Sequence, residues 1–113
     1  MLIYHLARAE EWHESGPSGA YAGGGHDRRD GFIHFSTSGQ IAESARKHRS
    51  GEADLLLLAV DAEALGKALR WETSRGGVLF PHLYGPLPPA AVVWSLPLPL
   101  DAQGRHVFPE LSD

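Results

Sequence analysis

The stretch Asp30-Gly31-Phe32-Ile33-His34-Phe35-Ser36-Thr37-Ser38-Gly39-Gln40-Ile41-Ala42-Glu43-Ser44-Ala45 contains the strand-to-helix transition around which we expect the fold to form. Residues 32–36 are aromatic or β-branched for the most part and follow a glycine, a pattern typical of a strand buried on both faces. Thr37 and Gln40 have the spacing of a capping box, which predicts a helix over about 38–48. Four polar side chains would lie at this junction: His34, Ser36, Thr37 and Ser38.

Two interpretations of this junction remain open. The free N–H groups and positive dipole end of a helix N-terminus suit an anion, so a phosphate or carboxylate could bind near Thr37–Gly39. In the alternative, the hydroxyl groups only cap the helix and His34 is a core histidine whose hydrogen bonds are satisfied.

The length of 113 residues predicts one domain over 1–113, with residues 100–113 as an extended tail after Pro97 and Pro99. No run of about 18 apolar residues is present, and the first residues lack the basic start of a signal peptide. The sequence has no cysteine, which excludes disulfides and fits the reducing cytoplasm. A formal charge of −4 argues against non-specific nucleic-acid binding. We therefore expect a cytoplasmic protein with neither a membrane nor non-specific nucleic acid as a partner.

The rest of the chain predicts an α+β fold with a mixed or mostly antiparallel sheet. The continuous apolar run Leu55–Asp61 is the clearest buried strand. The glycine-rich segment Ser15–Arg29 is predicted to be a long loop, and the prolines of Phe80–Pro86 place that segment at a sheet edge or a bend. Other predicted elements are strands at Leu2–Ala7, Leu69–Glu72 and Val92–Leu96 and a short helix at Ala9–Glu14.

Seven histidines are many for this length. His5, His34 and His82 lie on or beside predicted strands, and three convergent imidazoles can hold Zn²⁺. No helical pair of histidines at metal-binding spacing was found, and nothing in the spacing brings these three together. We therefore predict no metal site, and keep a histidine-based metal-dependent hydrolase as an alternative.

A second polar group lies toward the C-terminal half. His82 and Tyr84 alternate along one predicted strand and so share a face, while Glu72 and Arg75 flank a glycine turn. Near Trp71 and Trp94, this set is typical of a small-ligand pocket with apolar walls and a few polar groups. The alternative is a surface ion pair worth under about 1 kcal/mol beside an edge tyrosine.

Four segments together resemble the bacterial domain of unknown function 952 family over residues from Leu2 to about Leu98. They are Ile3-Tyr4-His5-Leu6, Asp30-Gly31-Phe32-Ile33-His34-Phe35-Ser36-Thr37 with Gln40, Leu69-Arg70-Trp71-Glu72, and Phe80-Pro81-His82-Leu83-Tyr84-Gly85-Pro86-Leu87. The family name implies no established activity.

A more distant resemblance, to the ADP-ribosyltransferases, implies two small, mostly antiparallel sheets with NAD in the cleft between them. It places His5 at the ribose next to nicotinamide and His34 or Ile33 near the stacking tyrosine. His82 or a neighbour stands where the transferase glutamate is expected, and a neutral histidine cannot supply its negative charge. Glu72 would have to reach the cleft from another strand.

The resulting hypothesis is a small domain that binds a nucleotide of the NAD or ADP-ribose type, or another phosphorylated small molecule, and acts as a possible ADP-ribosyl- or phospho-transferase. A non-enzymatic interaction module is the alternative, and a monomer is the expected state. The candidate catalytic residues are His34, His82 and Glu72. The candidate ligand-binding residues are His5, Ser36, Thr37, Ser38, Arg75 and Tyr84.

Overall fold

A computed structural model describes residues 1–113, except for the side chain of Arg75. The strands are β1 (Leu2–Arg8), β2 (Ile33–His34), β3 (Leu55–Asp61), β4 (Leu69–Thr73), β5 (Leu79–Leu83) and β6 (Val92–Leu98). The helices are α1 (Ala9–Ser15), α2 (Gly25–Asp30) and α3 (Ile41–His48), with 3-10 helices η1 (Ala62–Ala68), η2 (Arg75–Gly77) and η3 (Pro89–Ala91). Within the described residues, no helix has the length and apolar character needed to cross a membrane.

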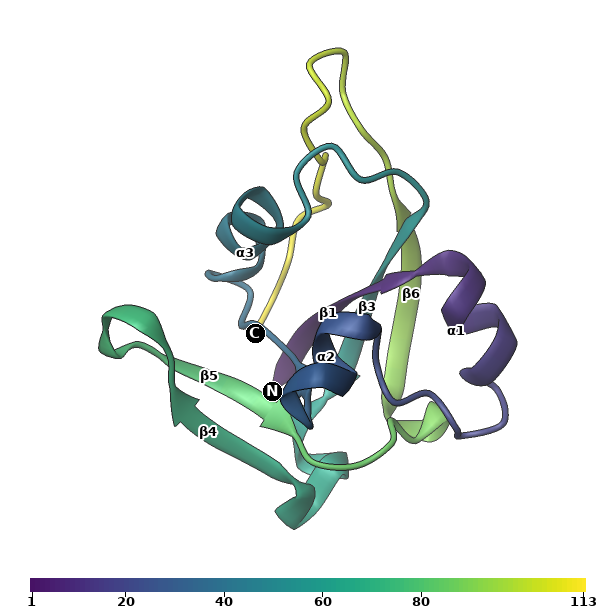
Figure 1. The fold of residues 1–113 in the computed structure, drawn as a ribbon, viewed down its shortest axis with the longest axis vertical. Coiled ribbons are helices and arrows are strands. Elements are labelled where there is room, and N and C mark those ends of the chain that lie inside the picture. The colour runs from purple at the N-terminus through teal and green to yellow at the C-terminus, as the bar shows by residue number, and fades with distance from the viewer.

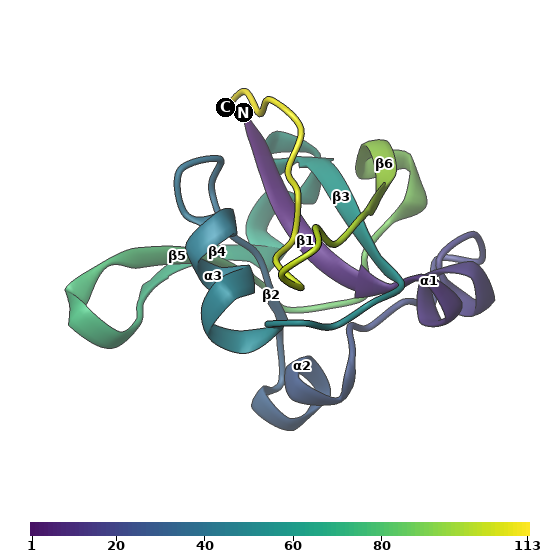
Figure 2. The same cartoon turned by 90° about the horizontal axis from the view of Figure 1, so that it is seen from above.

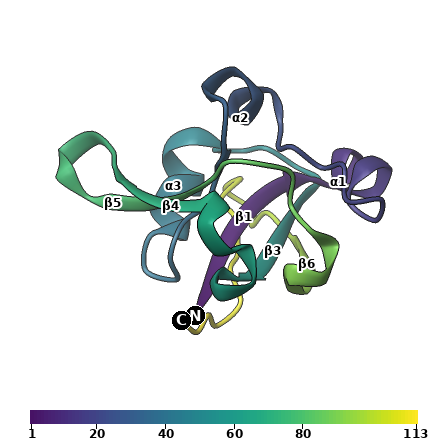
Figure 3. The same ribbon diagram turned by 90° about the horizontal axis from the view of Figure 1, so that it is seen from below.

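The strands form two antiparallel sheets with the orders β1-β3-β6 and β2-β5-β4 (Figure 1). The segment after β2 joins them, because Ser36 and Tyr4 exchange two backbone hydrogen bonds of 2.8 Å. The predicted α+β class with two small, mostly antiparallel sheets is therefore confirmed. The β4–β5 hairpin projects from the rest of the fold in all views (Figure 3).

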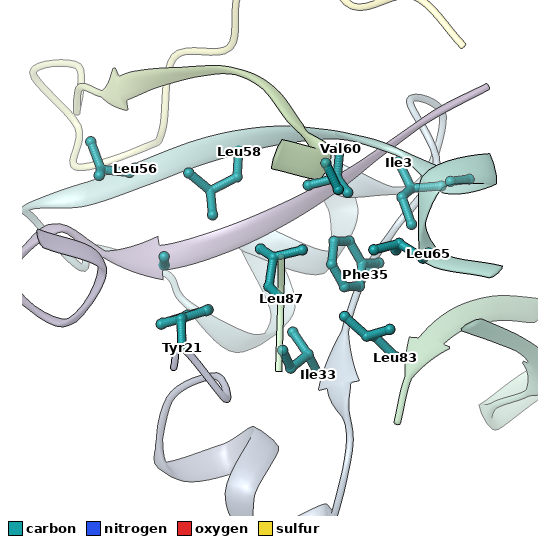
Figure 4. Close-up of a cluster of buried hydrophobic side chains, with 13 residues drawn as sticks. Ile3, Tyr21, Ile33, Phe35, Leu56, Leu58, Val60, Leu65, Leu83 and Leu87 are labelled. Atoms are coloured by element: carbon teal, nitrogen blue, oxygen red, sulfur yellow. The ribbon is translucent and has the colours of Figure 1, made fainter. Parts of the chain in front are cut away.

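The main core lies between the two sheets. Leu56, Leu58 and Val60 of β3 face Leu83 of β5 and Ile33 of β2 across this core (Figure 4). The other side of β3 carries a second cluster, which α3 and the C-terminal tail cover. Because both of its faces are covered, every residue from Leu55 to Val60 is buried, as the apolar run predicted.

The C-terminal tail returns to the start of the chain. After a turn closed by the bridge between Leu100 and His106, it runs back until Tyr4 donates its hydroxyl hydrogen to the carbonyl of Ser112. The two ends of the chain consequently lie side by side (Figure 2). The tail is thus packed against β1 and is not a free extension.

Two predicted boundaries around the central stretch are wrong. The strand over 32–36 is shortened to β2, because the chain leaves one sheet at Phe35 and reaches the other at Ser36. The helix begins at Ile41 because the N–H groups of Gln40 and Ile41 both bond to the carbonyl of Thr37, which forms a tight turn first. One half of the capping box is present, since Thr37 donates its N–H to Gln40 Oε1 at 3.0 Å.

The prediction that Ser15–Arg29 is entirely loop is also wrong. Its second half contains α2, whose start is closed by Asp27 Oδ2, the acceptor of the Gly24 N–H at 2.8 Å. The helix ends at Gly31, whose φ of 86° is the left-handed conformation that glycine adopts without strain. Tyr21 fixes the middle of the segment because its side chain is buried in the main core.

The sequence predicts residues 80–86 at a sheet edge or a bend, but β5 is the central strand of its sheet. Pro81 fits there because β2 pairs with only two residues of β5. The Pro81 carbonyl accepts a hydrogen bond from the N–H of Phe35 at 3.0 Å, so it points toward the end of β2. The nitrogen and the carbonyl of one residue point to the same side of an antiparallel strand, so the proline nitrogen, which has no hydrogen to donate, also faces the point where β2 ends. A proline in a central strand is tolerated here because its neighbour is so short.

Candidate functional site

The solvent-facing side of the β2-β5-β4 sheet gathers aromatic and charged side chains. Arg70, His82 and His34 are direct neighbours across the three strands, so they form one row on this side. The next core-facing row consists of Leu69, Leu83 and Ile33. We call the outer set the aromatic face, defined by Phe32, His34, Arg70, Glu72, His82 and Tyr84.

Two hydrogen-bond donors hold the side chain of Glu72 in place. One donor, His82, is on β5, and the other, Tyr84, directly follows that strand. Glu72 Oε1 accepts a hydrogen bond from the Tyr84 hydroxyl at 2.7 Å and from His82 Nδ1 at 2.9 Å. The hydrogen bond from Tyr84 lowers the pKa of the Glu72 carboxyl below its usual range, and the hydrogen bond from His82 adds a smaller effect in the same direction. The side of the sheet that carries His82 and Tyr84 therefore contains a fixed carboxylate, which strand β4 supplies.

Aromatic rings line the rest of this face. The Phe32 ring stacks on His82 with the centroids 4.0 Å apart and the planes at 28°, and it lies 5.2 Å from the Tyr84 ring. The Arg70 guanidinium carbon lies 5.0 Å above the centre of the Tyr84 ring, a cation–π arrangement. The face thus combines flat apolar surface with a cation and a carboxylate.

His34 connects this face to α2. Its Nδ1 lies 2.6 Å from Asp27 Oδ1, and its Nε2 lies 3.0 Å from Asp30 Oδ2. The ring also contacts Phe32 at 4.6 Å between centroids. Both ring nitrogens therefore face carboxylate oxygens, and the ring orientation is fixed from both sides.

Asp27 is a buried carboxylate that organises the turn from α2 into β2. Besides the His34 ring, it accepts hydrogen bonds from the backbone N–H of His34 at 2.9 Å and of Gly24. Gly23 has a φ of 91°, and a Cβ there would lie 2.4 Å from the Asp27 Cβ, so glycine is required for this approach. Burial raises the Asp27 pKa, but the hydrogen bonds from the side chain and backbone of His34 and from the backbone of Gly24 outweigh it and lower the pKa to about 2.

This pKa predicts a loss of stability in acid. Because the folded-state pKa lies below the ordinary value of 3.8, the stabilisation is complete above that pH and disappears as the pH falls toward 2. We expect this contribution to be about 2 kcal/mol. Urea unfolding between pH 5 and pH 2 should show a shallower loss for Asp27→Asn than for the wild type. Parallel losses in the two proteins would contradict this role for Asp27.

His5 lies in the core beneath this face. Its Nδ1 donates to the carbonyl of His34 at 2.6 Å, and its Nε2 accepts from the Tyr21 hydroxyl at 2.7 Å. Burial lowers the pKa of His5, which favours the neutral ring that this pair of bonds requires. His34 and His82 do come together, with ring centroids 5.6 Å apart, whereas both nitrogens of His5 are engaged elsewhere. His5 therefore has neither ring nitrogen free for a direct contact with a ligand.

The predicted serine and threonine residues surround the turn before α3. Ser36 is buried, and its hydroxyl pairs with that of Ser44 at 3.0 Å. Ser38 donates its hydroxyl hydrogen to the carboxylate of Asp113. A carboxylate from the chain itself therefore occupies the turn at which the sequence predicted an external anion.

Two further predicted positions, Trp71 and Trp94, lie apart from the aromatic face. The side chain of Arg75 is outside the described part of the structure. Trp71 alternates with Arg70 and Glu72 along β4, so it points to the opposite side of the sheet. Trp94 packs against Tyr4 in the second core cluster. Neither tryptophan therefore lies on the side of the sheet that carries Glu72, His82 and Tyr84.

Sequence reasoning missed five residues around His34 and His82. Alternation along a strand could have indicated Phe32 and Arg70. Phe32 lies two residues before His34, and Arg70 lies two residues before Glu72, so each shares a side with a predicted site residue. His26 and Asp30 have helical i, i+4 spacing, but they lie in a segment interpreted as loop. The missed residues are His26, Asp27, Asp30, Phe32 and Arg70.

Two surface depressions lie away from this site. One is lined by Ala9, Glu10, His13, Glu14 and Asp54 beside α1. The other lies between α3 and the tail turn and includes Arg46, Arg105 and His106. Neither contains the ring contacts and the held carboxylate of the aromatic face, so we place the candidate site on that face and not in the hollows.

Comparisons with known proteins agree on the family. Residues 6–95 match the sequence profile of the family described as protein of unknown function (DUF952). The crystal structure of protein CC0527 from Caulobacter crescentus is similar, with 46% identity, a TM-score of 0.89 and coverage of 95% of this chain and 94% of that one. Its solution NMR structure has 47% identity and a TM-score of 0.80, covering 92% and 90% of the two chains. No curated protein matches the sequence.

Proposed function

Because this chain belongs to the DUF952 family, whose function is unknown, its activity has to be argued from its side chains, and we propose that the aromatic face binds a nucleotide of the NAD or ADP-ribose type. One observation carries the proposal: the Glu72 carboxylate is fixed by His82 and Tyr84 beside stacked rings. Aromatic rings on which a base can stack, beside a few fixed polar groups, can recognise such ligands.

The charges on the face match the parts of a nucleotide. The rings of Tyr84 and Phe32 supply surface on which a base or nicotinamide ring would stack. Arg70, which is exposed and lies over Tyr84, supplies the positive charge for a phosphate. Glu72 is an acceptor for ribose hydroxyl groups. The ligand would thus extend across β5 from the aromatic rings toward Arg70.

Cleavage of NAD is the reaction that this arrangement fits. The bond between nicotinamide nitrogen and ribose C1′ would break, and nicotinamide would leave with the bonding electron pair. Positive charge then develops on C1′ and the ring oxygen, and the Glu72 carboxylate would stabilise it electrostatically. Water or another nucleophile adds to C1′ and loses its proton. Among the described side chains, both hydrogen bonds to Glu72 fall on Oε1, so Oε2 is the oxygen that would face the sugar.

A binding module without catalysis is the second candidate. It is favoured by the openness of the face, since Tyr84 is 40% exposed and Arg70 is exposed as well. Enzymes usually exclude water from reacting charges, which strengthens electrostatic stabilisation. Binding of ADP-ribose without any release of nicotinamide from NAD would identify this second function.

Calorimetric titration with NAD and ADP-ribose tests the proposal. We expect both to bind, and Arg70→Ala to weaken binding of both at least about tenfold, or about 1.4 kcal/mol, because their phosphates lose a cation. Arg105→Ala, which removes an exposed arginine of the tail turn, should leave both affinities unchanged. Absence of heat with either ligand at protein concentrations well above micromolar, or equal effects of the two variants, would contradict the proposal.

A further inference from the structure

Beside the aromatic face, three potential metal ligands converge on one point. One ligand atom each from His26, Asp30 and His34 lies within 4.8 Å of the other two. We propose that these residues form a binding site for a divalent transition-metal ion. The inference does not depend on nucleotide binding, and the experiment below contains no nucleotide.

The spacing of the ligand atoms fits a metal of this class. Asp30 Oδ2 lies 3.0 Å from His34 Nε2 and 3.6 Å from His26 Nε2. Two ligands bound at about 2.1 Å from one ion lie roughly 3.0 Å apart at a right angle and roughly 3.4 Å apart at the tetrahedral angle. The ion would therefore enter with only small shifts of these side chains.

The local fold explains why the three side chains meet. His26 and Asp30 are one helical turn apart on α2, so they share a side of that helix. The left-handed Gly31 then ends the helix, and β2 brings His34 back beside them, with its ring centroid 4.7 Å from that of His26. The ten consecutive residues from Gly25 to His34 are therefore sufficient to assemble the set.

A further carboxylate supports His34 as a ligand. Asp27 Oδ1 lies 2.6 Å from His34 Nδ1, so Nδ1 carries the proton and Nε2 is directed toward Asp30. A carboxylate that accepts from the distal nitrogen of a histidine is the usual support of a metal-bound imidazole. Asp27 is buried and held by two backbone N–H groups, so this support is rigid.

The donor set determines which ion fits. Two imidazoles and one carboxylate suit zinc and the other late divalent ions of the first row better than Mg²⁺ or Ca²⁺, which prefer oxygen ligands alone. Three protein ligands leave positions for water or for an oxygen atom of a bound molecule. The side chains of His26 and Asp30 are 58% and 37% exposed, so an ion can reach the site from solvent.

Arg29 has to move when the ion binds. Its guanidinium lies 2.7 Å from His26 Nδ1, the nitrogen that must carry the proton once Nε2 binds a metal. The arginine side chain is 72% exposed and can turn into solvent. Since its charge also repels a cation, Arg29→Ala should bind metal more tightly than the wild type.

The test is calorimetric titration of protein without a histidine tag with Zn²⁺, combined with NMR of the histidine ring nitrogens. We expect one equivalent of Zn²⁺ to bind, with shifted ring signals of His26 and His34 and unshifted signals of the buried His5. His26→Ala and Asp30→Asn should each weaken binding at least tenfold. His13→Ala, which removes an exposed histidine on α1, should not.

Melting temperatures distinguish loss of a ligand from loss of the fold. His26 and Asp30 are exposed, so both variants should melt within a few degrees of the wild type without metal. Absence of Zn²⁺ binding to the wild type would overturn the proposal and leave these residues as an ion-pair cluster. Binding that His26→Ala and His13→Ala reduce equally, or that Arg29→Ala weakens, would also overturn it.

Discussion

Replacing Leu57 by aspartate is expected to unfold the protein. Leu57 lies in the centre of β3, is 0% exposed, and belongs to the second core cluster, which α3 covers. A carboxylate there has no partner and would lose its hydration, at a cost of several kcal/mol. The total stability of a domain of this size is about 5–15 kcal/mol, so the variant should be largely unfolded.

The measurement is circular dichroism with a thermal melt. Val93→Asp is the matched control, because Val93 lies on the edge strand β6 and is 57% exposed. The control should keep a cooperative melt close to that of the wild type. A Leu57→Asp protein with an unchanged melting temperature would show that β3 is not the centre of the fold.

Replacing Glu72 by glutamine is expected to have the largest effect on the proposed reaction. The amide keeps the size of the side chain but removes the negative charge that would face the developing cation on ribose. We expect nicotinamide release from NAD to fall by a factor of about 10² to 10³, the usual effect of losing one preorganised electrostatic contact. Binding of ADP-ribose, which has already lost nicotinamide, should change much less.

One further variant tests the hydrogen bond that positions Glu72, and another serves as the matched control for loss of a carboxylate. Tyr84→Phe removes the hydroxyl that donates to Glu72 Oε1 but keeps the ring, so it should reduce the rate less than Glu72→Gln. Glu110→Gln, at an exposed carboxylate of the tail, should leave the rate unchanged. Equal rates for Glu72→Gln and wild type would exclude Glu72 from the reaction.

The strands were predictable where burial alone decides them. The run from Leu55 to Val60 is apolar throughout, and a strand covered on both faces has this pattern. The face shared by His82 and Tyr84 followed from alternation. The contact of both residues with Glu72 did not, because it depends on the register in which β4 pairs with β5.

The surroundings of His34 were less predictable. The helix α2 is too short to show an apolar period, and hydrogen bonds to Asp27 stabilise its ends instead. The burial of His5 was hidden for another reason. Alternation assigns it to one of two faces of β1, and the fold covers both, so its ring is in the core.

The central claim is that the aromatic face is a nucleotide site, and the most direct measurement is NMR mapping of ADP-ribose on ¹⁵N-labelled protein. We expect saturable shifts, with little change in α1 and the tail, concentrated at Phe32, His34, Arg70, Glu72, His82 and Tyr84. Absence of saturable shifts would contradict it, and so would shifts confined to the depression between α3 and the tail turn.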